Sequence, residues 1–147
     1  MKRGKRRCAI SYPTLRVIER VVNMLRDIYP MDSIEWKGGG VEQVEQAIAA
    51  ARWAFQLSKD RNCYARKLAA AAALFYELIM LHPLTDGNKR LASITLWAFL
   101  RVNRLSRPRN IAEAALKVAS REWGQEDVYK WLWRVYRASR SRSGRGG

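Results

Sequence analysis

The sequence predicts an all-α protein. Apolar residues recur at spacings of three and four through most of the chain, as on the buried face of a helix, and no alternating pattern of useful length indicates a strand. A length of 147 residues with 48% hydrophobic residues matches one domain with a substantial core. We therefore expect a single domain over residues 9–136, a basic N-terminal tail over residues 1–8 and a disordered Arg/Ser/Gly tail over residues 137–147.

The first three of about six predicted helices have recognisable ends. Pro13 and Pro30 enclose the first, because proline is tolerated in the first turn of a helix and stops it elsewhere. Three glycines at residues 38–40 form a flexible break before the second helix, and Asn62 can cap the third. These helices are expected over about residues 13–28, 41–55 and 63–81.

The third helix and the fourth, over residues 88–103, should lie at the centre of the bundle. The third is rich in alanine, which lets neighbouring helices approach closely. The fourth is apolar on nearly all sides, which is typical of a buried helix. Two more helices are expected over residues 111–120 and 126–136, and Ile34–Trp36 could form a short extended edge.

The formal net charge of +15 indicates a nucleic-acid partner only if it is concentrated on the folded domain. Residues 1–7 and 137–147 together carry nine Lys or Arg and no acid, which leaves +6 for the rest. The tails could attract RNA or DNA phosphates without sequence preference, or they could only increase the solubility of the protein. The charge alone does not decide between these readings.

Several classes of protein are excluded by the sequence. The longest apolar run, residues 68–84, is interrupted by Glu77 and does not reach the length of a membrane span. The basic N-terminus is not followed by the apolar stretch of a secretory signal. Cys8 and Cys63 lie far apart without a second pair or clustered histidines, so the sequence indicates neither a zinc site nor a disulfide framework. These features predict a cytoplasmic protein with no membrane partner.

The segment between the two central helices, residues 82–90, holds the only histidine of the chain. Pro83 disfavours helical geometry at His82, because the residue before a proline is pushed out of the helical region. Asp86 and Gly87 form a turn pair, and Asn88 can cap the helix that follows. The segment is thus predicted to be a loop that leads into a helix N-terminus.

The side chains of this loop are suited to phosphate chemistry. Free N–H groups and the positive dipole end of a helix favour an anion, and Gly87 lets a phosphate approach the backbone. Lys89 and Arg90 add positive charge, and Asp86 could hold a magnesium ion beside the phosphates. His82 could take a proton from an attacking hydroxyl. Each feature alone is common in helix-terminating loops, and only their joint order favours a functional site.

The segment from His82 to Arg90 reads His-Pro-Leu-Thr-Asp-Gly-Asn-Lys-Arg and resembles the Fic/Doc family signature, in particular its Doc branch. An alanine-rich helix precedes the signature, and a buried helix follows it and ends in Phe-Leu-Arg-Val-Asn, as in that family. The resemblance covers roughly residues 40–105. It implies a Fic/Doc-type helical bundle with the motif loop between two central helices.

The resemblance also implies roles for the motif residues. His82 would be the catalytic base, and Asp86 would bind the Mg²⁺ that bridges the phosphates of ATP, the co-substrate. The phosphate-binding positions would be Gly87, Asn88, Lys89 and Arg90. Lys89 stands where Fic enzymes have a glycine that admits the α-phosphate, and in the Doc branch this lysine accompanies a nucleotide that presents its γ-phosphate.

The function that the resemblance implies is a Doc-like toxin that phosphorylates a hydroxyl of a protein target, a translation factor being the expected one. The alternatives are transfer of AMP, as in Fic proteins, and a non-catalytic basic module that binds RNA or ribosomes. Ser93 stands where Fic enzymes have a second arginine, which fits the Doc branch.

Two further features bear on activity and regulation. Leu84 replaces the usual phenylalanine and can fill most of its packing role. The Ser/Thr-x-x-x-Glu-Gly/Asn inhibitory signature of self-restrained Fic proteins is absent from the sequence, so restraint is expected from a separate antitoxin. Residues 33–41 lie where the family places its target-docking flap, and Trp36 is either an exposed anchor for the partner chain or an ordinary half-buried residue.

Overall fold

The computed structural model describes residues 8–146, and these form six α-helices. Their bounds are α1 Leu15–Ile28, α2 Gly40–Leu57, α3 Cys63–Leu81, α4 Asn88–Val102, α5 Ile111–Ala119 and α6 Gln125–Gly146. Within this part of the chain the extended structure is limited to one isolated antiparallel bridge, between Trp36 and Leu84. The predicted all-α class is confirmed, and so is the extended edge at Ile34–Trp36, in the form of this single bridge.

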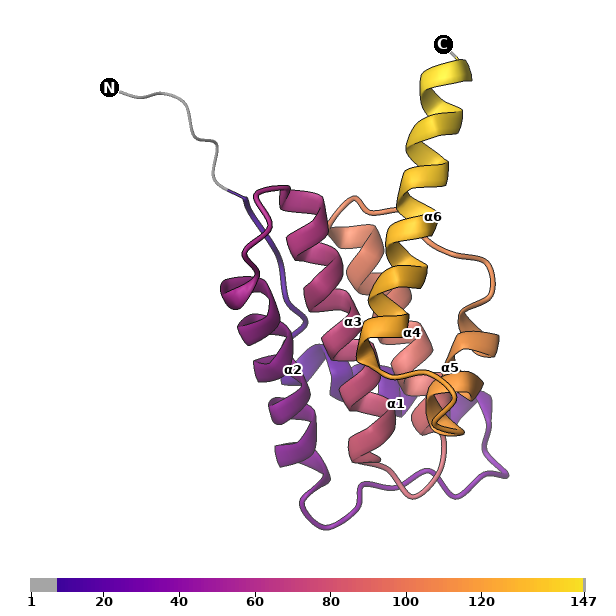
Figure 1. The fold of residues 1–147 in the computed structure, drawn as a ribbon. Helices are drawn as coiled ribbons and strands as arrows, with labels where there is room; N and C mark the ends of the chain where they lie inside the picture. The colour runs from indigo at the N-terminus through magenta and orange to yellow at the C-terminus, as the bar shows by residue number, and fades with distance from the viewer. Residues whose placement is uncertain (1–7, 147) are drawn as a thin grey trace.

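Helix α3 lies at the centre of the bundle and contacts α2, α4, α5 and α6 (Figure 1). Its small side chains permit this, since Ala70–Ala73 are all buried among the neighbouring helices. Helix α4 contacts α3, α5 and α1, and Leu91, Leu96 and Leu100 are buried along it. The loop between α3 and α4, residues 82–87, is called the motif loop below. Both of its ends are therefore attached to tightly packed helices.

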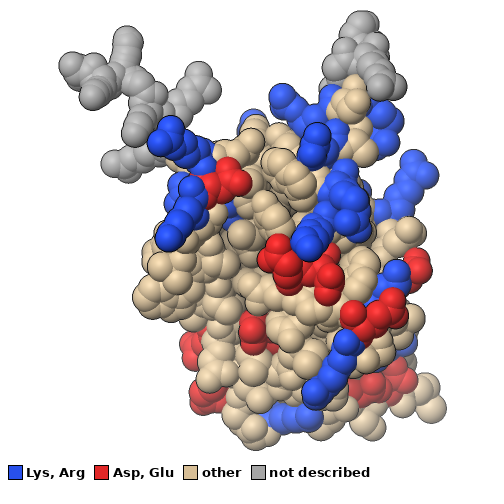
Figure 2. Space-filling view, viewed as in Figure 1, with Lys and Arg blue, Asp and Glu red and all other residues tan. Residues whose placement is uncertain are grey.

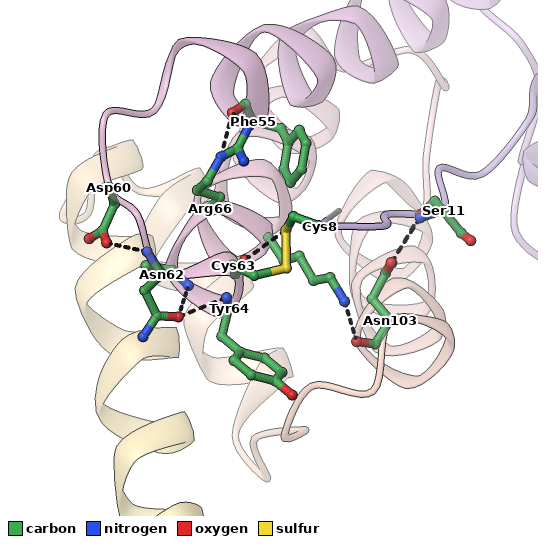
Figure 3. The surroundings of a disulfide bond; sticks show 11 residues. Cys8, Ser11, Phe55, Asp60, Asn62, Cys63, Tyr64, Arg66 and Asn103 are labelled. Carbon is green, nitrogen blue, oxygen red and sulfur yellow. Dashed lines mark hydrogen bonds between the residues drawn. A yellow bond between two sulfur atoms is a disulfide. The ribbon is translucent and has the colours of Figure 1, made fainter. Parts of the chain in front are cut away.

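The expectation of no disulfide framework is wrong at Cys8 and Cys63. They form a disulfide with a Cα–Cα distance of 5.4 Å, which joins the N-terminal segment to the first residue of α3 (Figure 3). Asn103 fastens the same segment a few residues further on, since its side chain accepts from the Ser11 amide at 2.8 Å and donates to the Ser11 carbonyl at 2.9 Å. The two cysteines are far apart in sequence, but the extended N-terminal segment passes the start of α3 and brings them together.

The C-terminal tail also differs from the prediction, because α6 continues through residues 137–146 and ends at Gly146. Ala and Arg are good helix formers, proline is absent here, and extending an existing helix requires no new nucleation. The predicted basic N-terminal tail, apart from Cys8, lies outside the described residues.

Candidate functional site

His82 ends α3 in a left-handed conformation, with φ 60° and ψ 59°. Pro83 follows it and prevents the helix from continuing, as the sequence predicted. The chain then turns from α3 towards α4, and the imidazole of His82 is left exposed at the end of the bundle. The position of the histidine is thus set by the end of a central helix.

The motif loop is fastened to the core by Leu84 and Asn88. Leu84 is completely buried, so a leucine does fill the packing position that the usual phenylalanine would occupy. Asn88 is 5% exposed, and its side chain accepts from the Leu84 amide and donates to the Leu84 carbonyl, both at 2.8 Å. The Asn88 side chain therefore holds the loop, and only its backbone amide is left for the phosphate-binding role that was predicted.

A second segment, Ser33–Lys37, pairs with the motif loop and forms one wall beside it. The Thr85 amide donates to the Glu35 carbonyl and the Lys37 amide to the Pro83 carbonyl, both at 2.9 Å. The Thr85 hydroxyl donates to the Ser33 carbonyl at 2.6 Å. This segment, called the flap below, is where the sequence placed a target-docking element, and Trp36 in it is half-buried.

The start of α4 is open to a ligand. Gly87 is its N-cap, with φ 86°, and the first helical hydrogen bond runs from the Leu91 amide to the Gly87 carbonyl at 2.9 Å. The three preceding amides, of Asn88, Lys89 and Arg90, therefore have no intrahelical acceptor and face the helix end. The Gly87 amide is already satisfied by Oδ1 of Asp86 at 2.8 Å. The observed N-cap, Gly87, is thus one residue before Asn88, the cap that the sequence predicted.

A pocket of about 230 Å³ lies at this helix end. Five of its lining residues are ones that the sequence singled out, namely His82, Asp86, Gly87, Asn88 and Lys89. Thr85 from the same loop also lines it. Ile79, Met80, Ala119 and Arg121 complete the lining. The structure therefore brings five of the six predicted site residues to one pocket and adds an arginine that the sequence did not single out.

Positive neighbours and burial lower the pKa of His82 below its ordinary value. Desolvation has the largest effect, followed by repulsion from Lys37 and then from Lys89. Nζ of Lys37 lies 2.9 Å from Nδ1 of the ring. A lysine ammonium can only donate a hydrogen bond, so in this arrangement Nδ1 accepts and the ring proton is on Nε2. The neutral imidazole is the favoured form near neutral pH.

Arg90, predicted to hold a terminal phosphate, points elsewhere. Its guanidinium pairs with Oδ2 of Asp32 at 2.9 Å and lies over the ring of Tyr29, 3.9 Å from the centroid. It lines a separate, mostly apolar pocket of about 410 Å³ between α1, α4 and α5. The sequence could not show this, because Asp32 and Arg90 are separated by 58 residues.

Two residues near the pocket were missed by the sequence, Lys37 on the flap and Arg121 between α5 and α6. Lysine and arginine are common in exposed loops, and nothing in their local sequence distinguishes these two. The left-handed conformation of Arg121, φ 68°, is visible only in the structure.

The donor set at the pocket fits magnesium better than zinc. Asp86 supplies one carboxylate, and among residues 8–146 no cluster of three or more His, Cys, Asp or Glu could hold a metal by itself. Mg²⁺ is commonly held by one or two carboxylates with phosphate oxygens and waters as the other ligands. Asp86 beside open helix amides matches that pattern.

The bundle and its pocket define an all-α domain with a histidine, a carboxylate, a helix N-terminus and a lysine at one site. The family model described as Fic/DOC family matches residues 11–100, and the chain belongs to this family. Members of the family are transferases that generally use a nucleoside triphosphate and Mg²⁺ to modify proteins. No curated protein and no solved structure matches the chain significantly. Over residues 8–146, the helices are too short or too polar to cross a membrane.

Proposed function

We propose that this protein is a Doc-like toxin that transfers the γ-phosphate of a nucleoside triphosphate to a hydroxyl of a translation factor. The observation that carries the proposal is the position of Lys89. It lies in the first turn of α4 and lines the pocket beside the open amides, at the motif position where a glycine would admit an α-phosphate. A lysine there narrows the approach to the helix end and adds a positive charge that suits the more highly charged terminal phosphate.

The residues of the pocket divide the reaction among them. Nδ1 of His82 accepts the proton of the attacking hydroxyl once the Lys37 ammonium, which donates to that nitrogen in this structure, has moved away. The hydroxyl oxygen forms a bond to the γ-phosphorus while the bond to the β–γ bridging oxygen breaks. The amides of Asn88 and Lys89, with the Lys89 ammonium, hold the phosphate oxygens. Mg²⁺ bound at Asp86 would neutralise phosphate charge.

Label transfer from ATP tests the proposal directly. The protein is incubated with translation factors and either γ-labelled or α-labelled ATP in the presence of Mg²⁺. We expect label from the γ-position on the target and none with a His82→Ala variant. Label from the α-position would instead establish AMP transfer, the alternative reaction of the family, and equal transfer by the variant would remove His82 from the mechanism.

We also propose that a separate antitoxin restrains the protein, because the inhibitory signature of self-restrained relatives is absent from this sequence. Expression of the chain alone should then arrest growth, and co-expression of a small protein encoded next to it should relieve the arrest. Arrest that no neighbouring gene relieves would contradict this proposal.

A second candidate function is non-specific binding of nucleic acid, and the charge of α6 favours it. The chain contains no acid after Asp127, while Arg134, Arg137, Arg140 and Arg142 are exposed along the helix. In Figure 2, Lys and Arg gather at the end of the molecule from which α6 emerges. A helical row of arginines can follow a phosphate backbone.

Truncation separates the two candidates. Removing residues 137–147 should weaken binding of a labelled single-stranded RNA in low salt if α6 is a nucleic-acid surface. Growth arrest that survives the truncation would assign the toxicity to the pocket, and arrest that is lost would assign it to α6.

A further inference from the structure

The pocket has a second wall, which comes from the end of α5 and the connection between α5 and α6. Ala119 and Arg121 contribute this wall. The positively charged residues that line the pocket are therefore Lys89, from the first turn of α4, and Arg121, from the connection after α5. An anion at the open end of α4 would share its pocket with both cations.

Arg121 is held in a conformation that its residue type does not favour. It follows the C-cap of α5, Ser120, with φ 68°, and its amide donates to the Val118 carbonyl at 3.0 Å. Glycine is the common residue at this place, because a β-carbon is sterically disfavoured in the left-handed region. The arginine is therefore not explained by the requirements of the turn.

The guanidinium of Arg121 also differs from that of Arg90 in its partners. Among the described residues, the ion pairs join Arg26 to Glu35, Arg90 to Asp32 and Lys117 to Glu113, and none involves Arg121. Arg121 is exposed at the pocket. Arg90, the arginine of the motif, thus pairs with Asp32 outside the pocket, while Arg121 is available to a ligand inside it.

We infer that Arg121 binds the phosphate chain of the nucleotide, in the place that the motif arginine leaves open in this structure. The inference rests on the proposed function, and it names the phosphate-binding groups of that same pocket. A guanidinium can bind two phosphate oxygens at once, and Arg121 would bind the chain together with Lys89. A volume of about 230 Å³ is below the roughly 300–1,000 Å³ of pockets that enclose a whole small-molecule ligand, which suits a phosphate chain with the nucleoside outside.

The chain offers a matched control for a test of Arg121. Arg104 has φ 60° and follows the end of α4, just as Arg121 follows the end of α5, but it lies near Lys67, where α3 begins, at the end of the bundle away from the pocket. Replacing either arginine by glycine removes one positive charge and relieves the same backbone cost. We therefore expect Arg121→Gly and Arg104→Gly to melt at the wild-type temperature or above it.

Calorimetric titration with Mg-ATP and with inorganic triphosphate then measures the role of Arg121. We expect the affinity of Arg121→Gly for both to fall about ten- to a hundredfold, the loss expected for a charged hydrogen bond, and that of Arg104→Gly to stay within about twofold of wild type. Arg121→Lys keeps the positive charge but cannot bind two phosphate oxygens in the geometry of a guanidinium. Its affinity should lie between those of Arg121→Gly and wild type.

The outcomes distinguish the inference from the proposed function. Equal affinity of Arg121→Gly and wild type, or an equal loss in both glycine variants, overturns the role of Arg121 whatever the reaction is. A wild-type protein that binds ATP through Arg121 but transfers no γ-label supports the inference and overturns the proposed function. A wild-type protein that binds neither probe overturns the inference.

Discussion

The environment of His82 favours a histidine that stays neutral at lower pH than usual. Burial, Lys37 and Lys89 all act in the same direction and hold its pKa below the ordinary 6.5. A lowered pKa means that the base form persists as the pH falls and is lost only when the pH passes through the folded-state value. Lys37 therefore tunes the acid side of the pH profile although it lies on the flap.

Substitution of Lys37 tests this tuning. In a Lys37→Met variant the repulsion from that ammonium is gone, so the pKa of His82 should rise and activity should be lost at a higher pH than in wild type. The measurement is the initial rate of γ-label transfer across the acidic range. Lys37→Arg retains the positive charge and is the control, since its acid limb should stay near that of wild type. If Lys37→Met loses activity at the same acidic pH as wild type, Lys37 has no influence on the pKa of His82.

Asn88 should contribute more to stability than its position at a pocket suggests. Asn88→Ala leaves the buried amide and carbonyl of Leu84 without their partners, and each such loss costs about 1–3 kcal/mol. We expect the free energy of unfolding in urea to fall by about 2 kcal/mol or more. Asn110→Ala is the control, because the Asn110 side chain makes no capping hydrogen bond, and it should change stability by less than about 0.5 kcal/mol.

At the scale of elements, the flap and the motif loop form one unit although they are far apart in sequence. Trp36 pairs with Leu84 in an antiparallel bridge, and Gly40 approaches the Pro83 carbonyl so closely that any β-carbon at position 40 would clash with it. The glycine run that the sequence indicated as a flexible break is thus in part a packing requirement. The start of α2, the flap and the motif loop therefore hold one another in place through these contacts.

Removal of the Thr85 hydroxyl should loosen this unit. Thr85→Val preserves the shape of the side chain but loses the bonds to the Ser33 carbonyl and from the Glu35 amide. We expect stability to fall by about 1–2 kcal/mol, at about 1 kcal/mol per hydrogen bond, and limited proteolysis to cut residues 31–39 faster than in wild type. Ser93→Ala removes a hydroxyl that bonds only to the Lys89 carbonyl within α4, and it should leave the cleavage rate unchanged. Equal cleavage rates in Thr85→Val and wild type would show that other contacts hold the flap.

The helices and the motif were predictable because their signals are local. Pro30, Asn62 and the pre-proline His82 mark helix ends through their own backbone chemistry, and the observed bounds of α1 to α5 lie close to those expected. The pairing of Arg90 with Asp32 and of Cys8 with Cys63 depends on which distant segments meet in the folded chain. No local pattern encodes such a contact, and the left-handed geometry of Arg121 is equally invisible in a sequence.

On the scale of the whole molecule, the two ends of α3 have different tasks. Its C-terminal end carries His82 and the pocket, while its N-terminal end is tied to the N-terminal segment by the disulfide (Figures 1 and 3). A helix of 19 residues is about 28 Å long at about 1.5 Å per residue. Changes at the tied end should therefore alter the stability of the bundle without altering the geometry of the site.

A variant without the disulfide tests this separation. The bond closes a loop between residues 55 apart, so the loss of unfolded-state constraint in Cys8→Ser/Cys63→Ser should lower stability by about 2–4 kcal/mol. We expect a lower melting temperature but an unchanged affinity for Mg-ATP at temperatures where the variant is folded. Reduction with dithiothreitol should lower the melting temperature of wild type to that of the variant and leave the variant itself unaffected. An affinity that falls together with stability would show that the two ends of α3 are coupled, because α3 would then transmit the loosening of its first turn to His82.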